Sequence, residues 1–302
     1  MKLLIKNGWI LTMDPLMKEY RDGYVWIEGD IIRDAGPTTA NLERYETAAD
    51  EIIDASGHIV MPGLVNGHTH LFQTFMRGLA DDKPLLQWLQ EEIWPYSTLM
   101  EEEDFYLAGL LGCVENIKNG ATSVLDQHYV HTSPHTSDRV LEAMDTSGIR
   151  GNLCRCYADI KYYPALREEK STIMSSIERL TSEWHGSRDG RLSISLGPLN
   201  PWACSPELFK ESFEYAETHD LRFQVHTAEA DEVVELTLDA YGMRNVTFFD
   251  SLGIMGERTQ LVHSVRLDGE ELDIVEKSGA MVVHCPVANM YLASGVAPVP
   301  EM

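Results

Sequence analysis

From about residue 59 onward, short runs of apolar residues alternate with longer stretches whose apolar positions recur at helical spacing. The short runs predict buried strands, and the longer stretches predict amphipathic helices that cover them. Alternation of the two is typical of parallel β-α units. The predicted strands cover residues 59–65, 121–125, 151–157, 192–199, 221–225, 259–262 and 280–283, and the clearest helices cover 102–118, 171–184, 206–219 and 269–277.

These seven strands are one fewer than a (β/α)8 barrel contains. We expect an α/β fold in which residues 59–302 form a TIM-type barrel with seven visible strands. A doubly wound open sheet is the alternative arrangement of the same units.

The first 58 residues have a different texture, with short apolar runs separated by tight-turn signals. Asn7-Gly8 follows the run 3–5, and Gly29 lies between the runs 24–27 and 31–32. This pattern predicts a small antiparallel β unit. Because so small a sheet is marginal on its own, we expect residues 1–58 to pack against another part of the protein.

Histidines follow the predicted barrel strands. His68 and His70 come after the first strand, and His226, His263 and His284 each follow a later one. The carboxyl ends of parallel barrel strands form the face that carries the active site. Residues two apart on an extended segment also point the same way. We therefore expect five of the eleven histidines to converge on one mouth of the barrel.

Neutral imidazoles from separate strands are suitable ligands for zinc or iron. Glu229 lies three residues beyond His226, within reach of a metal held there. A carboxylate beside a metal-activated water is a general base that can return the proton to a leaving group. The alternative for Glu229 is an ordinary place in an exposed acidic loop.

Composition limits the kinds of binding partner and the cellular compartment that we expect. With 24 Lys and Arg against 48 Asp and Glu, the formal net charge is −24, which disfavours both nucleic acid and an anionic membrane surface as partners. Five cysteines without a CxxC pair do not suit a disulfide framework, so a reducing, cytoplasmic location is expected. No signal peptide or run of about 18 apolar residues is present, so we expect no membrane span.

Several familiar motifs are missing from the sequence. It contains no dinucleotide-binding GxGxxG, no phosphate-binding GxxxxGK[ST] and no GxSxG nucleophile elbow. It also lacks the HxE and PCxxC signature of cytidine-deaminase zinc sites.

Segment 61–70 (MPGLVNGHTH) resembles the first metal motif of the amidohydrolase superfamily. Members combine a (β/α)8 barrel with a small β-sandwich built from both chain ends, which would include residues 1–58. His226 with Glu229, His263 and the segment 284–289 follow in the superfamily's order. Segment 77–89 is similar to the methylthioadenosine/S-adenosylhomocysteine deaminases and shares features with the s-triazine chlorohydrolases.

The resemblance implies that His68, His70 and His226 hold one divalent metal, zinc first and iron second. Glu229 would move protons, and His263 would orient the attacking hydroxide. The fourth barrel strand, 192–199, has no bridging lysine of the hydantoinase type, so a single-metal site is expected.

The reaction implied by the resemblance is hydrolytic deamination of an N-heteroaromatic amine. Hydroxide held by the metal attacks the ring carbon, and ammonia leaves. Arg155 and His284 match positions on the substrate side. Ser97 and Leu199 replace the glutamate and histidine that the nucleoside deaminases present to substrate, which favours a smaller or flatter heterocycle.

Three points stay open at this stage. Hydrolysis of s-triazines is the alternative activity, and an inactive fragment or a non-enzymatic assembly homologue is the alternative outside enzymes. The superfamily's last metal ligand, an aspartate at the end of the eighth strand, is expected beyond Met302. A homodimer is the general expectation for the oligomeric state.

Overall fold

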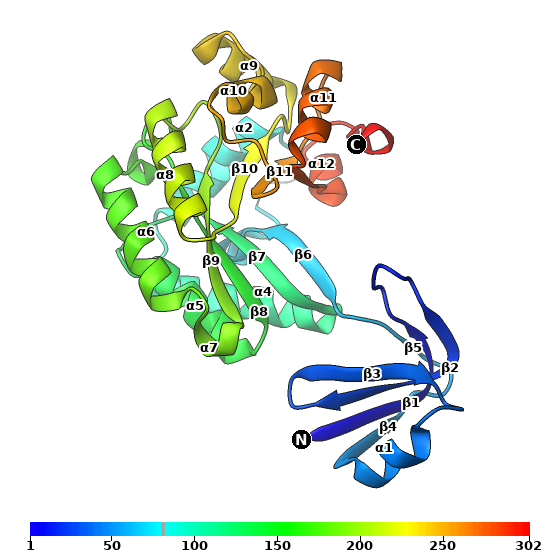
Figure 1. Cartoon of the computed structure of the whole chain (residues 1–302). Helices are drawn as coiled ribbons and strands as arrows, with labels where there is room; N and C mark the ends of the chain where they lie inside the picture. The colour runs from blue at the N-terminus through cyan, green and yellow to red at the C-terminus, as the bar shows by residue number, and fades with distance from the viewer. Residues whose placement is uncertain (80–81) are drawn as a thin grey trace. The chain divides into compact units, whose positions relative to one another are not determined.

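The computed structural model describes residues 1–79 and 82–302 (Figure 1). Within these residues the chain forms two compact units, Met1–Leu64 and Val65–Met302. Each unit has its own sheet and its own buried apolar cluster, so the two are described in turn.

The first unit begins with an antiparallel meander. Strand β1 (Lys2–Leu11) pairs antiparallel with β2 (Glu19–Glu28), and β2 pairs antiparallel with β3 (Ile31–Pro37). Gly29, at φ 67°, adopts the left-handed conformation in the tight turn between β2 and β3. The predicted antiparallel unit is therefore confirmed for these three strands.

The remaining two strands of this sheet run parallel to β1, which the sequence pattern did not predict. Helix α1 (Leu42–Ala48) supplies the crossover that a parallel connection requires. It leads into β4 (Glu51–Asp54), and β5 (Ile59–Val60) follows. The sheet is consequently mixed, with β1 at the junction of its two halves.

Asn7-Gly8 forms a bulge inside β1 and does not turn the chain, contrary to the hairpin that the dipeptide predicted. The pairing register shifts between Lys6 and Gly8 and again between Gly8 and Ile10. Asn7 has φ 62°, in the left-handed region that asparagine tolerates, so one irregular residue is absorbed and the strand continues.

The second unit contains seven parallel strands that curl into a nearly closed barrel (Figure 1). Neighbours in the sheet are also neighbours along the chain, so the open doubly wound alternative is wrong. The two edge strands approach each other closely, because a Cβ on Gly67 would lie 3.2 Å from the side chain of Val283. The strands are β6 (Leu64–Thr69), β7 (Ala121–His128), β8 (Arg150–Tyr157), β9 (Leu192–Pro198), β10 (Phe223–Thr227), β11 (Thr259–His263) and β12 (Met281–Val283).

Helices cover the outer face of this barrel (Figure 1). The four helices expected from amphipathic spacing are all confirmed, with ends that shift by one residue at most. The helices are α2 (Leu85–Trp88), α3 (Trp94–Ser97), α4 (Glu102–Lys118), α5 (Thr136–Ser147), α6 (Lys170–Trp184), α7 (Ser187–Gly190), α8 (Pro206–Thr218), α9 (Asp231–Tyr241), α10 (Asn245–Ser251), α11 (Gly269–Ser278) and α12 (Pro286–Tyr291), with 3-10 turns at Leu71–Met76, Pro164–Leu166 and Val299–Glu301 and a π turn at Leu89–Ile93.

The predicted strand 59–65 is divided between the two sheets. Ile59–Val60 pairs with β1, and the barrel strand begins only at Leu64, because Pro62 offers no backbone N–H for continued pairing. The sequence pattern had placed His68 beyond the end of this strand. In the structure His68 lies within β6. His70 follows the strand directly.

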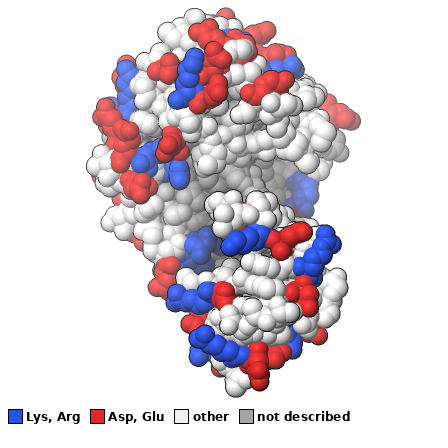
Figure 2. Space-filling view, turned by 45° about the vertical axis from the view of Figure 1, so that its right-hand side comes forward, with Lys and Arg blue, Asp and Glu red and all other residues white. Residues whose placement is uncertain are grey.

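Charged side chains are interspersed on the face seen in Figure 2, where Lys and Arg alternate with Asp and Glu. Among the described residues of this face there is no continuous basic stripe of the kind that follows a phosphate backbone. Within residues 1–79 and 82–302, no helix is long and apolar enough to cross a bilayer.

Candidate metal centre and active site

Three histidines from two strands point at one spot in the barrel. His68 and His70 come from the end of β6, and His226 comes from β10, which lies across the barrel from it. One ring nitrogen from each of the three lies within 4.8 Å of the others. This spacing suits three ligands of a single ion, and among the described residues it is the one group with such a geometry.

Hydrogen bonds fix the tautomer of two of these rings. His70 donates its Nδ1–H to the carbonyl oxygen of Gln127, 2.6 Å away, and His226 donates its Nδ1–H to the carbonyl of Leu199, 2.9 Å away. A backbone carbonyl can only accept, so Nδ1 must carry the proton in both rings. Nε2 is then left with a free lone pair, which is the form that binds a metal.

Burial also keeps the three rings neutral. It lowers the pKa of His68 to about 3, and it lowers those of His70 and His226 well below their ordinary value. Neighbouring imidazoles add to this effect, because two positive charges at this distance repel. The donor set of three neutral nitrogens therefore fits a divalent ion such as zinc.

Glu229 and His263 lie beside the three histidines. The carboxylate oxygen Oε2 of Glu229 is 3.6 Å from Nε2 of His263, and His263 donates its Nδ1–H to Oδ1 of Asn289 at 2.8 Å. Burial, with a smaller contribution from Glu232, raises the pKa of Glu229 to about 8. A carboxyl group with such a pKa can both accept and return a proton near neutral pH.

The backbone that carries these two residues is strained. Ala228, His263 and Ser264 have φ values of 43°, 71° and 52°, a region that residues with a Cβ rarely adopt. Backbone hydrogen bonds tie the two segments together, from Ser264 N to Thr227 O and from Val265 N to Ala228 O. Strain of this kind clusters at functional sites, where the surrounding structure holds it in place.

A cavity of about 270 Å³ lies next to this cluster, and its lining includes Glu229 and the four histidines His68, His70, His226 and His263. Most of the rest of its wall is apolar or aromatic, with Thr69, Gln73 and Asn200 as polar exceptions. The other side chains of this wall are Leu85, Leu86, Trp88, Leu89, Tyr129, Tyr162, Leu199, Trp202, Val233, Cys285, Ala288 and Leu292. A flat, largely apolar ligand is the natural occupant of a space with these walls.

The structure does not bring Arg155 to this cavity. Its guanidinium lies on the helix side of the sheet, where it donates to Glu168 at 2.6 Å and to Ser176 at 3.1 Å. It lines a separate hollow next to α6. Residues alternate faces along a strand, and Arg155 falls on the outward-facing set of β8.

His284 likewise does not line the cavity. It is exposed directly after β12, and it makes only a small contribution to the lowered pKa of His263, which is mainly due to burial. Ser97 is fully buried away from the cavity, with its hydroxyl bonded to the carbonyl of Trp94. Leu199, the other departure from the nucleoside pattern, does line the wall.

Two functional neighbours were not singled out from the sequence. Asn289 holds the ring of His263, and Gln224 contacts the ring of His68. Position 224 lies two residues before His226 on the same face of β10, so strand alternation alone could have identified it. Asn289 lies within a segment noted for its resemblance, but no sequence spacing indicated its contact.

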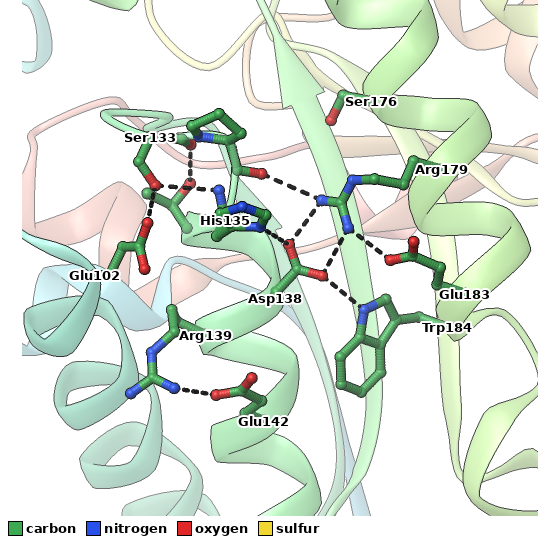
Figure 3. Close-up of polar contacts among 12 residues, drawn as sticks. Glu102, Ser133, His135, Asp138, Arg139, Glu142, Ser176, Arg179, Glu183 and Trp184 are labelled. Atoms are coloured by element: carbon green, nitrogen blue, oxygen red, sulfur yellow. Dashed lines mark hydrogen bonds and ion pairs between the residues drawn. The ribbon is translucent and has the colours of Figure 1, made fainter.

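A second polar cluster lies apart from the metal site, around Asp138 on α5 (Figure 3). Asp138 accepts from Arg179 at 2.7 and 2.9 Å and from the indole N–H of Trp184 at 2.8 Å, and His135 lies 3.6 Å away. These contacts join α5 to α6. His135 therefore belongs to a structural network between two helices.

Comparison with known proteins agrees with this geometry. The model of the amidohydrolase family matches residues 59–302. The chain is 34% identical over 300 residues to a 5-methylthioadenosine/S-adenosylhomocysteine deaminase of Pelotomaculum thermopropionicum, covering 99% of this chain and 66% of that protein. It is 35% identical to a 5'-deoxyadenosine deaminase of Methanococcoides burtonii, covering 99% and 65%. The chain thus spans just under two thirds of these relatives.

Solved structures show the same fold. An adenosine deaminase from Xanthomonas campestris with bound zinc superimposes with a TM-score of 0.89 at 27% identity, over 99% of this chain and 66% of that one. A triazine hydrolase from Arthrobacter aurescens gives 0.90 at 23% identity, over 99% and 68%, and supports the fold alone. The family match covers most of the chain, and the resemblance seen in the sequence is thereby confirmed: the chain belongs to the amidohydrolase family.

Proposed function

We propose that this chain carries the metal-binding and proton-transfer residues of a hydrolase that removes an amino group from N-heteroaromatic rings. The observation that carries the proposal is the convergence of three neutral histidine nitrogens with the buried Glu229 in the wall of a largely apolar cavity. The relatives' names, which include adenosine, deoxyadenosine and methylthioadenosine deaminases, support the same class of reaction.

His68, His70 and His226 are proposed to hold one divalent ion, zinc in the first place and iron in the second. The zinc in the Xanthomonas structure supports this choice, as does the all-nitrogen donor set. When bound, such an ion lowers the pKa of a coordinated water to near 7 and so supplies a nucleophile at neutral pH.

We propose that Glu229 transfers protons during the reaction and that His263 orients the attacking water. Glu229 accepts a proton from the attacking water and gives it to the departing amino nitrogen, so that the bond from the ring carbon to that nitrogen is replaced by a bond to oxygen and the amino group leaves as ammonia. His263 carries its proton on Nδ1, toward Asn289, and therefore presents a lone pair on Nε2 toward Glu229 and the attacking water. It can orient that water by accepting a hydrogen bond.

The cavity wall restricts the substrate. Besides Glu229 itself, none of the described residues that line the cavity is an acid, Lys or Arg, so no second charge is available to fix a sugar diol or a phosphate. We therefore propose a neutral heteroaromatic amine whose ring lies between aromatic and leucine side chains. Neither Arg155 nor His284 enters this part of the proposal, because neither lines the cavity.

The compartment proposed is the cytoplasm. Cys113, Cys154, Cys156, Cys204 and Cys285 are all free thiols in the structure, and four of the five are buried. Thiols that form no disulfide are typical of reducing compartments.

The test is ammonia release from a panel of heteroaromatic amines by the zinc-loaded protein. Glu229→Gln keeps the shape of the side chain and removes its proton transfer, so turnover should fall by about 10²–10⁴-fold while bound zinc is unchanged. Glu235→Gln, which changes an exposed acid on α9, is the matched control and should retain activity. Full turnover by Glu229→Gln would contradict the proposed role. Chloride release from chlorinated triazines in place of ammonia would favour the dechlorinating alternative.

A further inference from the structure

The ring of His68 differs from the other two histidines in how it is held. The backbone carbonyls of Gln127 and Leu199 bind His70 and His226, whereas His68 has a side chain as its partner. That partner is Gln224, whose Oε1 lies 3.0 Å from Nδ1 of His68. Gln224 is fully buried inside the barrel.

The backbone carbonyl of Gly67 fixes the orientation of the Gln224 amide, because a carbonyl oxygen can only accept a hydrogen bond. Its Nε2 lies 3.1 Å from the carbonyl oxygen of Gly67 and 3.1 Å from Oε1 of Gln260. A flipped amide would place two oxygens against each other at the Gly67 carbonyl, which is repulsive. The NH2 group must therefore face Gly67, and the amide oxygen must face His68.

This orientation fixes the proton on His68. Because the amide oxygen of Gln224 can only accept, Nδ1 of His68 must be the donor, and Nε2 keeps its lone pair for a metal. Without this partner, the neutral ring could carry its proton on Nε2 as well, and that tautomer cannot bind an ion at Nε2.

The barrel provides the geometry for this arrangement. Gln224 and His226 are two residues apart on β10 and so face the same interior side. Gln224 also lies beside Gln260 in the register of β10 and β11, which allows the two amides to bond across neighbouring strands. β10 thus supplies one proposed ligand and, two residues earlier, the group that orients another.

We propose that Gln224 is a positioning residue that selects the metal-binding tautomer of His68, supported by Gly67 and Gln260. The inference rests on the proposed metal site and not on the substrate or the reaction. Of the three proposed ligands, His68 is the one whose orientation a side-chain substitution can remove, since its two counterparts are held by backbone atoms.

The first test is zinc affinity of the metal-free chain, measured by competition with a chromophoric chelator. Gln224→Met preserves side-chain length and removes the acceptor, so zinc affinity should fall by about 10–100-fold, the usual effect of losing a partner of a ligating histidine. Gln224→Glu in its protonated form, with its O–H toward the Gly67 carbonyl, keeps an oxygen acceptor for the same Nδ1–H and should recover part of the loss. A purely structural role for the residue does not predict this recovery.

Asn152→Leu is the matched control for the loss of a partly buried amide in this barrel. Asn152 bonds to Ser193 and Ser195 and to none of the histidines, so its removal should leave zinc affinity unchanged. If Gln224→Met binds zinc as tightly as the parent, or if Asn152→Leu weakens binding equally, the proposal is wrong.

A second measurement does not depend on whether any Gln224 variant folds. Long-range ¹H–¹⁵N spectra of the metal-free parent, labelled at histidine, distinguish the two neutral tautomers, with His68 assigned from the spectrum of His68→Asn. We expect the Nδ1–H form at His68, and the Nε2–H form would overturn the proposal. Neither readout involves turnover, so a failure to find deaminase activity would leave this inference intact.

Discussion

Asp126 places a carboxylate against the backbone directly after the second histidine of the cluster. Its Oδ1 accepts from the N–H of Leu71 at 2.6 Å, and its Oδ2 has no hydrogen-bond partner among the described residues. His128, two residues on, lies 3.9 Å away on the same outward-facing side of β7. Asp126 is thus an anchor for the turn that follows His70, in a place where a negative charge is poorly solvated.

Burial of Asp126 makes the free energy of unfolding depend on pH. It raises the pKa of Asp126 to about 7, so between about pH 4 and pH 7 the folded chain holds a proton that the unfolded chain has released. The contribution of Asp126 to the free energy of unfolding therefore falls as pH rises through this window. Buried histidines with lowered pKa act in the opposite direction, so the effect of Asp126 must be isolated with a variant.

Asp126→Asn keeps an acceptor for Leu71 and cannot ionise. Relative to the parent, its free energy of unfolding should increase by a few kcal/mol between pH 4 and pH 7, since each pKa unit corresponds to about 1.4 kcal/mol. Urea unfolding at several pH values measures the difference. The exposed Asp239→Asn should show a constant difference, and a constant difference for Asp126→Asn would contradict the prediction.

At this scale the sequence predicted the histidine cluster better than its surroundings. His68, His70, His226 and His263 could be grouped because strand ends meet at one mouth of the barrel. The outward direction of Arg155 could not be predicted, because its position near a strand end says nothing about which face it occupies.

Close packing between strands shapes the site at the scale of elements. Gly197, near the end of β9, lies where β8 and β10 both approach. A Cβ there would be 2.6 Å from Sγ of Cys154 and 2.8 Å from the carbonyl oxygen of Gln224. Backbone cannot move aside as a flexible side chain can, so this glycine allows β10 to sit where its histidine reaches the cluster.

Gly197→Ala should accordingly destabilise the chain by about 1–3 kcal/mol, the usual effect of overpacking a close-packed interior. It should also weaken zinc binding, because β10 must shift. Gly269→Ala is the control. It lies in the first turn of α11 with nothing within 4 Å of the added methyl group, so the change should be neutral or stabilising by about 0.5 kcal/mol. Urea denaturation measures the free energy of unfolding of both variants. Equal stability of Gly197→Ala and the parent would contradict the predicted overpacking at Gly197.

Element boundaries were predictable where local chemistry marks them. Helix α11 is capped by Asp268, whose side chain accepts from the N–H of Glu271 while the Glu271 side chain accepts from the N–H of Asp268, and the helix ends before Gly279 at φ 69°. The prediction of one strand over residues 59–65 was wrong because these apolar residues belong to two different sheets. Hydrophobic pattern does not reveal which sheet a strand joins.

At the scale of the whole molecule, alternation of strands and helices was sufficient to predict the barrel. Each β-α unit adds one strand beside the last, and so the order β6 to β12 follows the chain. The mixed sheet of the first unit was less predictable, because parallel pairing of β4 and β5 with β1 depends on contacts between residues about 50 positions apart. Local sequence carries no signal for such pairs.

The proposed metal-dependent hydrolytic site, made of the histidine cluster and Glu229, can be tested by titrating zinc into the metal-free protein while ammonia release from a heteroaromatic amine is followed. We predict no release without metal and a rise that saturates at one zinc per chain, lost in His226→Ala. Full release without metal, or none from any amine of the panel once one zinc is bound per chain, would contradict the account.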